Sequence, residues 1–146
     1  MDYTKKMLNE VLVKIFNTIM FNEEAYLKDN LNQDITIRGV HTLEAIDEAN
    51  KENDASMGNI ASHLMVTAGS LTVLIKKLEL KGYIARTQSK QDKRSFNITL
   101  TKKGEKVLNI HTKYHQEMID MITRNLSKKE EENLIDLLSK IKYYFS

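Results

Sequence analysis

The sequence predicts a single domain that is mainly α-helical and carries one small β-hairpin. Apolar residues recur at helical spacing through most of the 146 residues, and the chain contains no proline to interrupt its helices. Apolar and polar residues alternate in two short neighbouring runs, residues 83–89 and 96–101, as they do in paired strands. A length of 146 residues is typical of one domain.

Three helices are predicted in the first part of the chain. Residues 3–27 place apolar side chains along one helical stripe, and a second helix begins near Thr36. A polar loop is expected at residues 48–54 because the apolar pattern stops there. Ser56 is suited to cap a third, short helix that ends near Leu64, since a serine side chain accepts a hydrogen bond from the first turn.

The second part is predicted to hold a fourth helix, the hairpin and two more helices. Thr67 is suited to cap the fourth helix, and Gly82 is suited to follow its last turn, where glycine accepts left-handed backbone angles. Thr101 is expected to cap a long fifth helix. Ser127 and Glu130 then match the capping box S-x-x-E, which opens the last helix.

Positive charge is concentrated in residues 67–106. This segment contains ten Lys and Arg against three Asp and Glu, a net charge of +7. The whole chain carries only +2, so the remaining residues together carry −5. A basic segment of this strength indicates a polyanionic partner, and helices followed by a basic-tipped hairpin favour duplex DNA.

The third and fourth predicted helices are joined by only a short connection at residues 65–66, which predicts a helix-turn-helix. In this motif the second helix enters the major groove with its N-terminal residues against the base edges. Residues 67–72 are small or hydroxylated, so the helix can approach closely and its hydroxyl groups can bond bases or phosphates. Lys76 and Lys77 follow one to two turns later and suit phosphate neutralisation.

The hairpin is predicted to be a wing whose tip enters the minor groove. Arg94 is the arginine of the tip, and arginine is attracted to a narrow, A·T-rich minor groove. Asp92 can either bond the Arg94 guanidinium or cap the turn. A solvated basic hairpin, or a protein-interaction module without a DNA role, is the alternative interpretation. The residues expected to contact DNA are Thr67, Ser70, Thr72, Lys76, Lys77, Lys90, Asp92, Lys93 and Arg94.

The composition argues against several other classes of function. The chain has no cysteine, which excludes disulfides, thiol chemistry and cysteine-ligated zinc. It has no glycine-rich phosphate loop and no G-x-S-x-G motif, so neither an enzyme nor a cofactor is expected. No apolar run approaches the roughly 18–20 residues of a membrane span, and the N-terminus lacks a signal-peptide pattern. A cytoplasmic location is therefore expected.

Three motifs of the basic segment resemble the MarR (multiple antibiotic resistance regulator) family of winged-helix transcription factors. They are L-E-x-x-G-Y-I-x-R at residues 78–86, D-x-R at 92–94 and L-T-x-x-G at 100–104, in the family's order and spacing. The predicted helices on both sides also match, so the resemblance covers nearly the whole chain.

The resemblance implies one MarR-like domain over residues 1–146. A winged helix-turn-helix would span about residues 35–101, flanked by dimerisation helices at about 3–28 and 102–145. It also implies a homodimeric, ligand-tuned repressor of a pseudo-palindromic operator, with Asp92 and Arg94 as the wing pair.

Within the family the chain is most similar to repressors of fatty-acid biosynthesis genes. The similarity lies in ITIRGVHTLEAID (35–47), LMVTAGSLT (64–72), TLTKKG (99–104) and HTKYHQEM (111–118). It implies that an acyl chain on acyl carrier protein acts as corepressor and raises the affinity for DNA.

Three of the four histidines have two competing interpretations. His111 and His115 lie one helical turn apart, and His41 lies on the second predicted helix. They are either partly buried polar residues beside an acyl pocket, or a zinc site together with Glu23 or Glu24, as in zinc-sensing members of the family. The expected effector pocket consists of Phe16, Met20, His41, His111, Tyr114 and His115.

Overall fold

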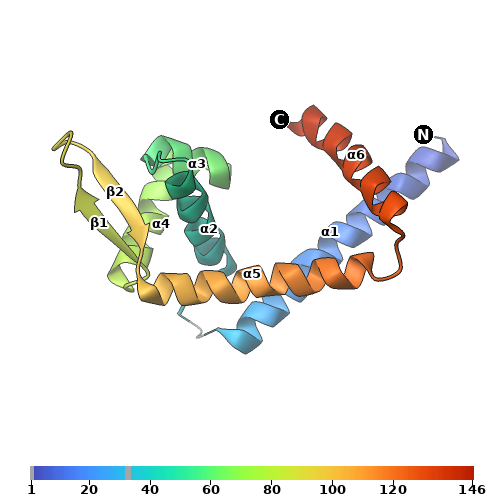
Figure 1. The fold of residues 1–146 in the computed structure, drawn as a ribbon, viewed down its shortest axis with the longest axis horizontal. Coiled ribbons are helices and arrows are strands. Elements are labelled where there is room, and N and C mark those ends of the chain that lie inside the picture. The colour runs from blue at the N-terminus through green and yellow to red at the C-terminus, as the bar shows by residue number, and fades with distance from the viewer. Residues whose placement is uncertain (1, 32–33) are drawn as a thin grey trace. The chain divides into compact units, whose positions relative to one another are not determined.

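The computed structural model describes residues 2–31 and 34–146, and it confirms a mainly α-helical fold with one β-hairpin (Figure 1). The elements are α1 (Tyr3–Asn30), α2 (Ile37–Lys51), α3 (Met57–Leu64), α4 (Ala68–Leu80), β1 (Ile84–Gln88), β2 (Phe96–Leu100), α5 (Lys102–Thr123) and α6 (Lys128–Phe145). No single described helix has both the length and the apolar character of a membrane span, and α3 and α4 meet that criterion only when taken together as a bent pair.

The chain divides into two compact units, Met1–His111 and Thr112–Ser146. The first unit holds α1, α2, α3, α4, the hairpin and the first part of α5. The second unit holds the rest of α5 and α6.

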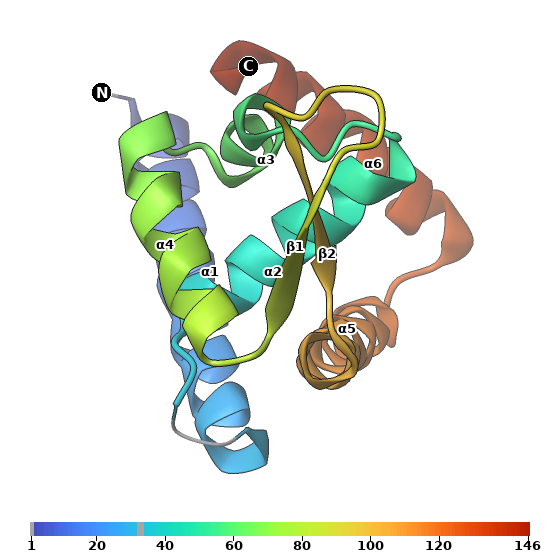
Figure 2. The same cartoon turned by 90° about the vertical axis from the view of Figure 1, so that its left-hand side faces the viewer.

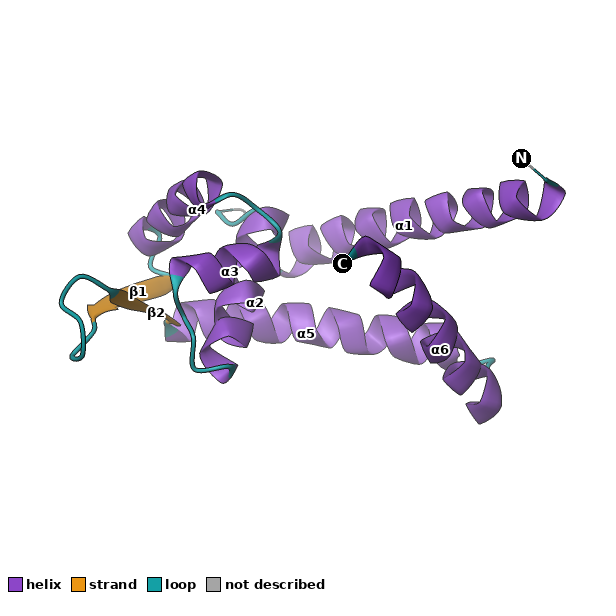
Figure 3. Cartoon of the chain, turned by 90° about the horizontal axis from the view of Figure 1, so that it is seen from above, coloured by secondary structure: helices purple, strands orange, loops and turns teal. Residues whose placement is uncertain are grey.

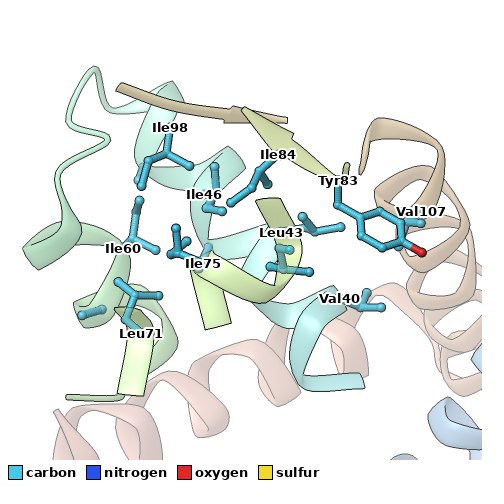
Figure 4. Close-up of a cluster of buried hydrophobic side chains, with 14 of the residues drawn as sticks. Val40, Leu43, Ile46, Ile60, Leu71, Ile75, Tyr83, Ile84, Ile98 and Val107 are labelled. Atoms are coloured by element: carbon cyan, nitrogen blue, oxygen red, sulfur yellow. The ribbon is translucent and has the colours of Figure 1, made fainter. Parts of the chain in front are cut away.

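The core of the first unit lies between α2, α3, α4 and the hairpin (Figures 2 and 4). Ile46 of α2, Ile60 of α3, Leu71 and Ile75 of α4, and Ile98 of β2 are almost fully buried. Burying one such side chain contributes about 1.5–3 kcal/mol. The elements of the predicted helix-turn-helix and wing therefore share one hydrophobic core.

Side-chain caps confirm four predicted helix starts, including that of α5, where Thr101 Oγ1 accepts from the Gly104 N–H. Ser56 Oγ accepts a hydrogen bond at 3.2 Å from a backbone N–H in the first turn of α3. Thr67 Oγ1 accepts one at 3.2 Å from the Ser70 N–H in α4. At α6, Ser127 and Glu130 form both hydrogen bonds of the capping box. These boundaries are local and were predictable because each cap bonds a residue three positions away.

The end of α4 confirms the role of Gly82 and corrects the start of the first strand. Gly82 has a φ of 79°, and its N–H bonds the Glu79 carbonyl at 3.0 Å. The Tyr83 N–H bonds the Leu78 carbonyl at 2.9 Å. This pair of bonds is a Schellman motif. Tyr83 belongs to the helix cap, so β1 begins one residue later than predicted.

Two predicted helix ends are wrong. The polar stretch 48–54 is not entirely a loop, because α2 continues to Lys51. Lys51 Nζ pairs with Asp47 and Glu48 at 2.8 Å each, and such pairs three or four residues apart stabilise an exposed polar helix. Helix α1 continues to Asn30, whose side chain donates to a carbonyl of the preceding turn at 2.8 Å. Both helices therefore continue into polar residues, beyond the apolar pattern that predicted them.

The start of α5 is fastened to the end of α4. Thr101 Oγ1 donates to the Gly82 carbonyl at 2.6 Å and accepts from the Gly104 N–H at 3.2 Å. A Cβ atom on Gly104 would lie 2.2 Å from the Tyr83 carbonyl oxygen. Glycine is therefore required at position 104, because any side chain would push α5 away from the base of the hairpin.

Helices α1 and α6 leave most of their apolar side chains exposed. In α1 only Glu23 and Leu27 are buried, and in α6 no residue is buried. The large exposed apolar residues of α1, after the N-terminal Tyr3, are Met7, Leu8, Val11, Val13, Ile15, Phe16, Met20 and Phe21, and those of α6 are Leu134, Ile135, Leu137, Leu138, Ile141, Tyr143, Tyr144 and Phe145. Contiguous apolar faces of this kind mark surfaces for association.

Candidate nucleic-acid interface

A sharp turn separates α3 from α4. The chain bends by 99° between the two helices, within the range of about 90–120° for a helix-turn-helix. Met65 has left-handed backbone angles with a φ of 55°, and the Val66 N–H bonds the Ala61 carbonyl at 3.1 Å. The structure therefore forms the predicted helix-turn-helix, with the N-terminal end of α4 exposed at the surface.

The two faces of α4 differ in polarity and burial. One face carries Leu71, Ile75 and Leu78, which are buried in the core. At 100° per residue the opposite face is centred on Gly69 and Val73. Val73 is 62% exposed. This outward face is the part of α4 that can enter a groove of DNA.

The five residues predicted to contact DNA from α4 and its cap are all exposed. Thr67 Oγ1 donates to Ser70 Oγ at 3.1 Å, and Thr72 Oγ1 donates to a backbone carbonyl one turn back at 2.9 Å. The Thr72 proton is thus occupied, and its hydroxyl is left as an acceptor. Lys76 and Lys77 extend from the same exposed side of the helix.

The loop at residues 89–95 forms the tip of the hairpin, which projects away from the helices of its unit (Figure 3). Asp92 Oδ1 accepts a hydrogen bond from the Arg94 N–H at 2.9 Å, and the Asp92 carbonyl accepts one from the Ser95 N–H at 3.0 Å. Of the two roles predicted for Asp92, the structure shows the turn cap. The exposed basic residues of this loop are Lys90, Lys93 and Arg94.

The wing is tied to α4 by an ion pair that the sequence pattern did not predict. Strands β1 and β2 pair antiparallel in a register that runs from Ile84 opposite Leu100 to Gln88 opposite Phe96. Arg86 of β1 donates through Nε to the carboxylate of Glu79 near the end of α4. The ion pair fixes the base of the wing to the helix that precedes it.

Asp34 links three separate parts of the first unit. Its side chain accepts hydrogen bonds from the Tyr83 hydroxyl and, at 3.4 Å, from Lys103 Nζ, and its carbonyl accepts one from Lys81 Nζ. The Lys103 ammonium also lies 4.2 Å from the centre of the Tyr83 ring. Asp34, three residues before α2, is thereby bonded to the end of α4 and the start of α5.

Two pKa shifts follow from this arrangement. The hydrogen bond from Tyr83 lowers the pKa of Asp34, and Lys103 and Lys81 add to the effect. Burial, followed by the bond to Asp34, raises the pKa of Tyr83 to about 12. Asp34 therefore stays charged and Tyr83 stays a donor near neutral pH. Sequence gave no signal for this pair, whose members are 49 residues apart.

Known proteins share this arrangement. Residues 35–96 match the MarR family. The HTH-type transcriptional regulator SarZ of Staphylococcus epidermidis is 32% identical over 111 residues, which cover 76% of this chain and 70% of SarZ. The chain belongs to the MarR family. It is therefore a DNA-binding transcriptional regulator with the winged helix-turn-helix fold.

Solved structures of MarR-family regulators agree with this assignment. Streptococcus pneumoniae FabT, in a complex with DNA, superposes on this chain with a TM-score of 0.86 at 33% identity. The alignment covers 99% of this chain and 97% of FabT. S. aureus MepR, also in a complex with DNA, has a TM-score of 0.76 at 26% identity. This alignment covers 93% of this chain and 94% of MepR. Both neighbours bind DNA.

A buried polar cluster lies outside the DNA-binding surface of this MarR-family chain. Glu23 Oε1 accepts hydrogen bonds from His41 Nε2 at 2.8 Å and from His111 Nε2 at 2.6 Å. Glu23 and His111 are buried, and Glu44 lies 3.7 Å from His111 Nδ1. We call Glu23, His41 and His111 the Glu23 cluster. The acidic partner of these histidines is therefore Glu23, whereas Glu24 is exposed.

Burial and the histidines act in opposite directions on Glu23. Burial raises its pKa, but the hydrogen bonds and charges of His41 and His111 together outweigh burial and lower the pKa. Glu23 is therefore held as a carboxylate inside the first unit. A buried carboxylate requires such partners, because an isolated one would be strongly disfavoured.

The remaining four residues of the expected effector pocket belong to α1 and to the second unit. Phe16 and Met20 are each 65% exposed on α1, on the helical face that leads to Glu23. Tyr114 and His115 belong to the second unit, where their rings meet edge to face with centroids 5.3 Å apart. Within the first unit, the structure gathers His41 and His111 with Glu23 and leaves Phe16 and Met20 exposed.

Proposed function

We propose that this chain is a homodimeric repressor that controls fatty-acid biosynthesis genes, with an acyl chain on acyl carrier protein as corepressor. The main support is its similarity to fatty-acid repressors in four stretches, two of which contain the histidines His41, His111 and His115. The similarity to FabT over nearly the whole chain supports the same assignment.

The exposed apolar faces of α1 and α6 support a homodimer. Nine large apolar residues of α1 and eight of α6 are uncovered. The hydrophobic effect, about 25 cal/mol for each Å² of apolar surface removed from water, favours covering such faces. A second copy of the chain offers matching faces, and two-fold symmetry suits a pseudo-palindromic operator.

The proposed mechanism is geometric. In a dimer, two copies of α4 must enter major grooves about one helical turn, or about 34–36 Å, apart. An acyl chain bound between the helices of the two protomers would favour the arrangement with this spacing. The corepressor must bind that arrangement more tightly than the others, since only differential affinity shifts an equilibrium. Phe16 and Met20, on the α1 face that leads to the Glu23 cluster, offer apolar contacts for such a chain.

A titration of acylated carrier protein into an operator-binding assay tests this proposal. The acylated form is expected to raise operator affinity, and the unacylated carrier protein, as the matched control, is expected to leave it unchanged. Equal affinity in both titrations would exclude the acyl sensor while leaving the DNA-binding assignment intact.

The Glu23 cluster favours a second candidate, a zinc-responsive regulator. One carboxylate oxygen and two imidazole nitrogens meet at one point, and these are donor types that zinc prefers. Glu23, His41 and His111 would hold the ion, and His115, one turn after His111 in α5, is the further ligand that the sequence predicts. The donor set therefore fits zinc, which would act as the regulatory ligand.

Elemental analysis of the purified chain separates the two candidates. The zinc regulator requires bound metal near one equivalent per chain and an operator affinity that falls after chelation. His41→Ala is then expected to lose both the metal and the response to it. If chelated protein still responds to acylated carrier protein, the Glu23 cluster is structural and the first proposal holds.

A further inference from the structure

Gly69 lies in the first turn of α4, where this chain itself does not require a glycine. A Cβ atom built on Gly69 would meet nothing within 4 Å, and the backbone is not in the left-handed region. By contrast, Gly82 has a φ of 79°, and a Cβ on Gly104 would clash with the Tyr83 carbonyl. Glycine lowers helix stability relative to alanine. Gly58 has the same open space, but only Gly69 lies on the outward face of α4, so its absent side chain permits close approach by DNA.

Val73 follows Gly69 by one turn on the same outward face. It is 62% exposed, directly opposite the buried Leu71, Ile75 and Leu78. Val73 lies at the centre of the outward face and is not among the described core residues of its unit. The missing side chain at Gly69 leaves the Val73 methyl groups accessible from the N-terminal side, since helix side chains lean in that direction.

The polar groups of this helix leave little direct base readout. Residues 67–77 contain no Arg, Asn, Gln, Asp or Glu, so the usual bidentate contacts of Arg to guanine and of Asn or Gln to adenine are unavailable. The Thr72 hydroxyl already donates its proton to a backbone carbonyl. The Ser70 hydroxyl, Lys76 and Lys77 remain for phosphates or bases. The major-groove feature that an apolar surface can read is the 5-methyl group of thymine.

We propose that Gly69 and Val73 form a notch on α4 that receives the 5-methyl group of a thymine in each operator half-site. Gly69 would supply the space and Val73 the apolar contact. The notch would discriminate thymine from cytosine, which lacks the methyl group, without a hydrogen bond. This inference goes beyond the regulatory ligand and is independent of it.

Replacement of operator thymines by deoxyuridine tests the notch directly. Deoxyuridine removes only the methyl group and keeps base pairing. With the operator mapped by footprinting, each thymine of a half-site is replaced in turn and the affinity of the full-length protein is measured. One position is expected to lose affinity by about fourfold, the factor that corresponds to one buried methyl-sized group. No sensitive position in either half-site would overturn the proposal.

Protein variants then assign the sensitive thymine to the notch. Val73→Ala is expected to bind unmodified operator about fourfold more weakly and to show no further loss with deoxyuridine. Leu80→Ala is the matched control, because Leu80 is 87% exposed on the same face but two turns farther from the N-terminus. It is expected to keep the full deoxyuridine penalty. A penalty that persists unchanged in Val73→Ala would refute the assignment.

Two glycine variants give an independent test. Gly69→Ala and Gly58→Ala each add a Cβ that meets nothing within 4 Å, so both are expected to raise the melting temperature slightly. Only Gly69→Ala is expected to weaken operator binding and to reduce the deoxyuridine penalty, because its methyl group fills the notch. Unchanged operator affinity in a folded Gly69→Ala protein would contradict the close approach.

Discussion

The helix-turn-helix with its wing and the long helices α1 and α6 differ in how their apolar side chains are covered. Leu43, Ile60 and Ile75 are fully buried among α2, α3, α4 and the hairpin. Leu137 of α6 is 58% exposed and Phe16 of α1 is 65% exposed. The DNA-binding part therefore has a complete core within one chain, whereas the long helices have apolar faces that association would cover.

A matched pair of leucine variants tests this difference most strongly. Leu43→Ala is expected to lower the free energy of unfolding by about 2–5 kcal/mol, because it removes buried methyl groups and leaves a cavity. Leu137→Ala is expected to weaken self-association instead. Urea unfolding at several protein concentrations and sedimentation measure the two effects. A dimer that is unaffected by Leu137→Ala would argue against α6 as an interface.

Glu23 is one of the two buried residues of α1. A Glu23→Gln variant measures how much its hydrogen bonds contribute to stability. This change is expected to lower stability at pH 7 by about 1.5–3 kcal/mol, through loss of hydrogen bonds to a charged group. Glu24→Gln, at the exposed neighbour, is the control and should have little effect.

The lowered pKa of Glu23 sets the sign of the pH dependence. Its contribution is fully present above the ordinary pKa of about 4.3 and is lost as the pH falls through the lowered value. Urea midpoints between pH 7 and pH 3 should therefore fall less steeply in Glu23→Gln than in the parent protein. Parallel curves would mean that Glu23 is not the titrating group.

Alanine variants of Arg94 and Lys102 compare the contributions to operator binding of two basic residues on either side of β2. Arg94→Ala is expected to weaken operator binding by about tenfold, because Arg94 is exposed in the wing loop, where it can enter a groove of DNA. Lys102→Ala is expected to have a smaller effect, since Lys102 lies at the start of α5 on the domain side of the hairpin. Gel-shift titrations at two salt concentrations measure both. Equal losses would contradict the wing assignment.

The capping box of α6 gives the smallest expected effect. Ser127→Ala is expected to cost about 0.5–2 kcal/mol, because the hydroxyl loses its bonds with the Glu130 N–H and the Glu130 carboxylate. Ser127→Asp, which retains a capping acceptor, should recover most of the melting temperature. If neither variant changes the melting temperature, the start of α6 frays before the protein unfolds.

Local chemistry made much of the DNA-binding part predictable. Ser56, Thr67 and Ser127 cap their helices through bonds to residues three positions away, and Gly82 ends α4 through its own backbone angles. Such signals lie within one turn of chain, so they can be read without knowledge of the fold. Helical periodicity also places Val73 opposite the buried face, although an apolar residue at that position was not predicted to contact DNA.

Tertiary structure decided the contacts between distant residues. The sequence by itself could not choose between Glu23 and Glu24, because both end the same stripe, and only folding brings Glu23 to His111, 88 residues away. The bond between Asp34 and Tyr83 has no local signal for the same reason. Periodicity and caps follow from neighbouring residues and determine the elements. The partners of buried polar groups depend on how those elements pack, so only the folded chain determines them.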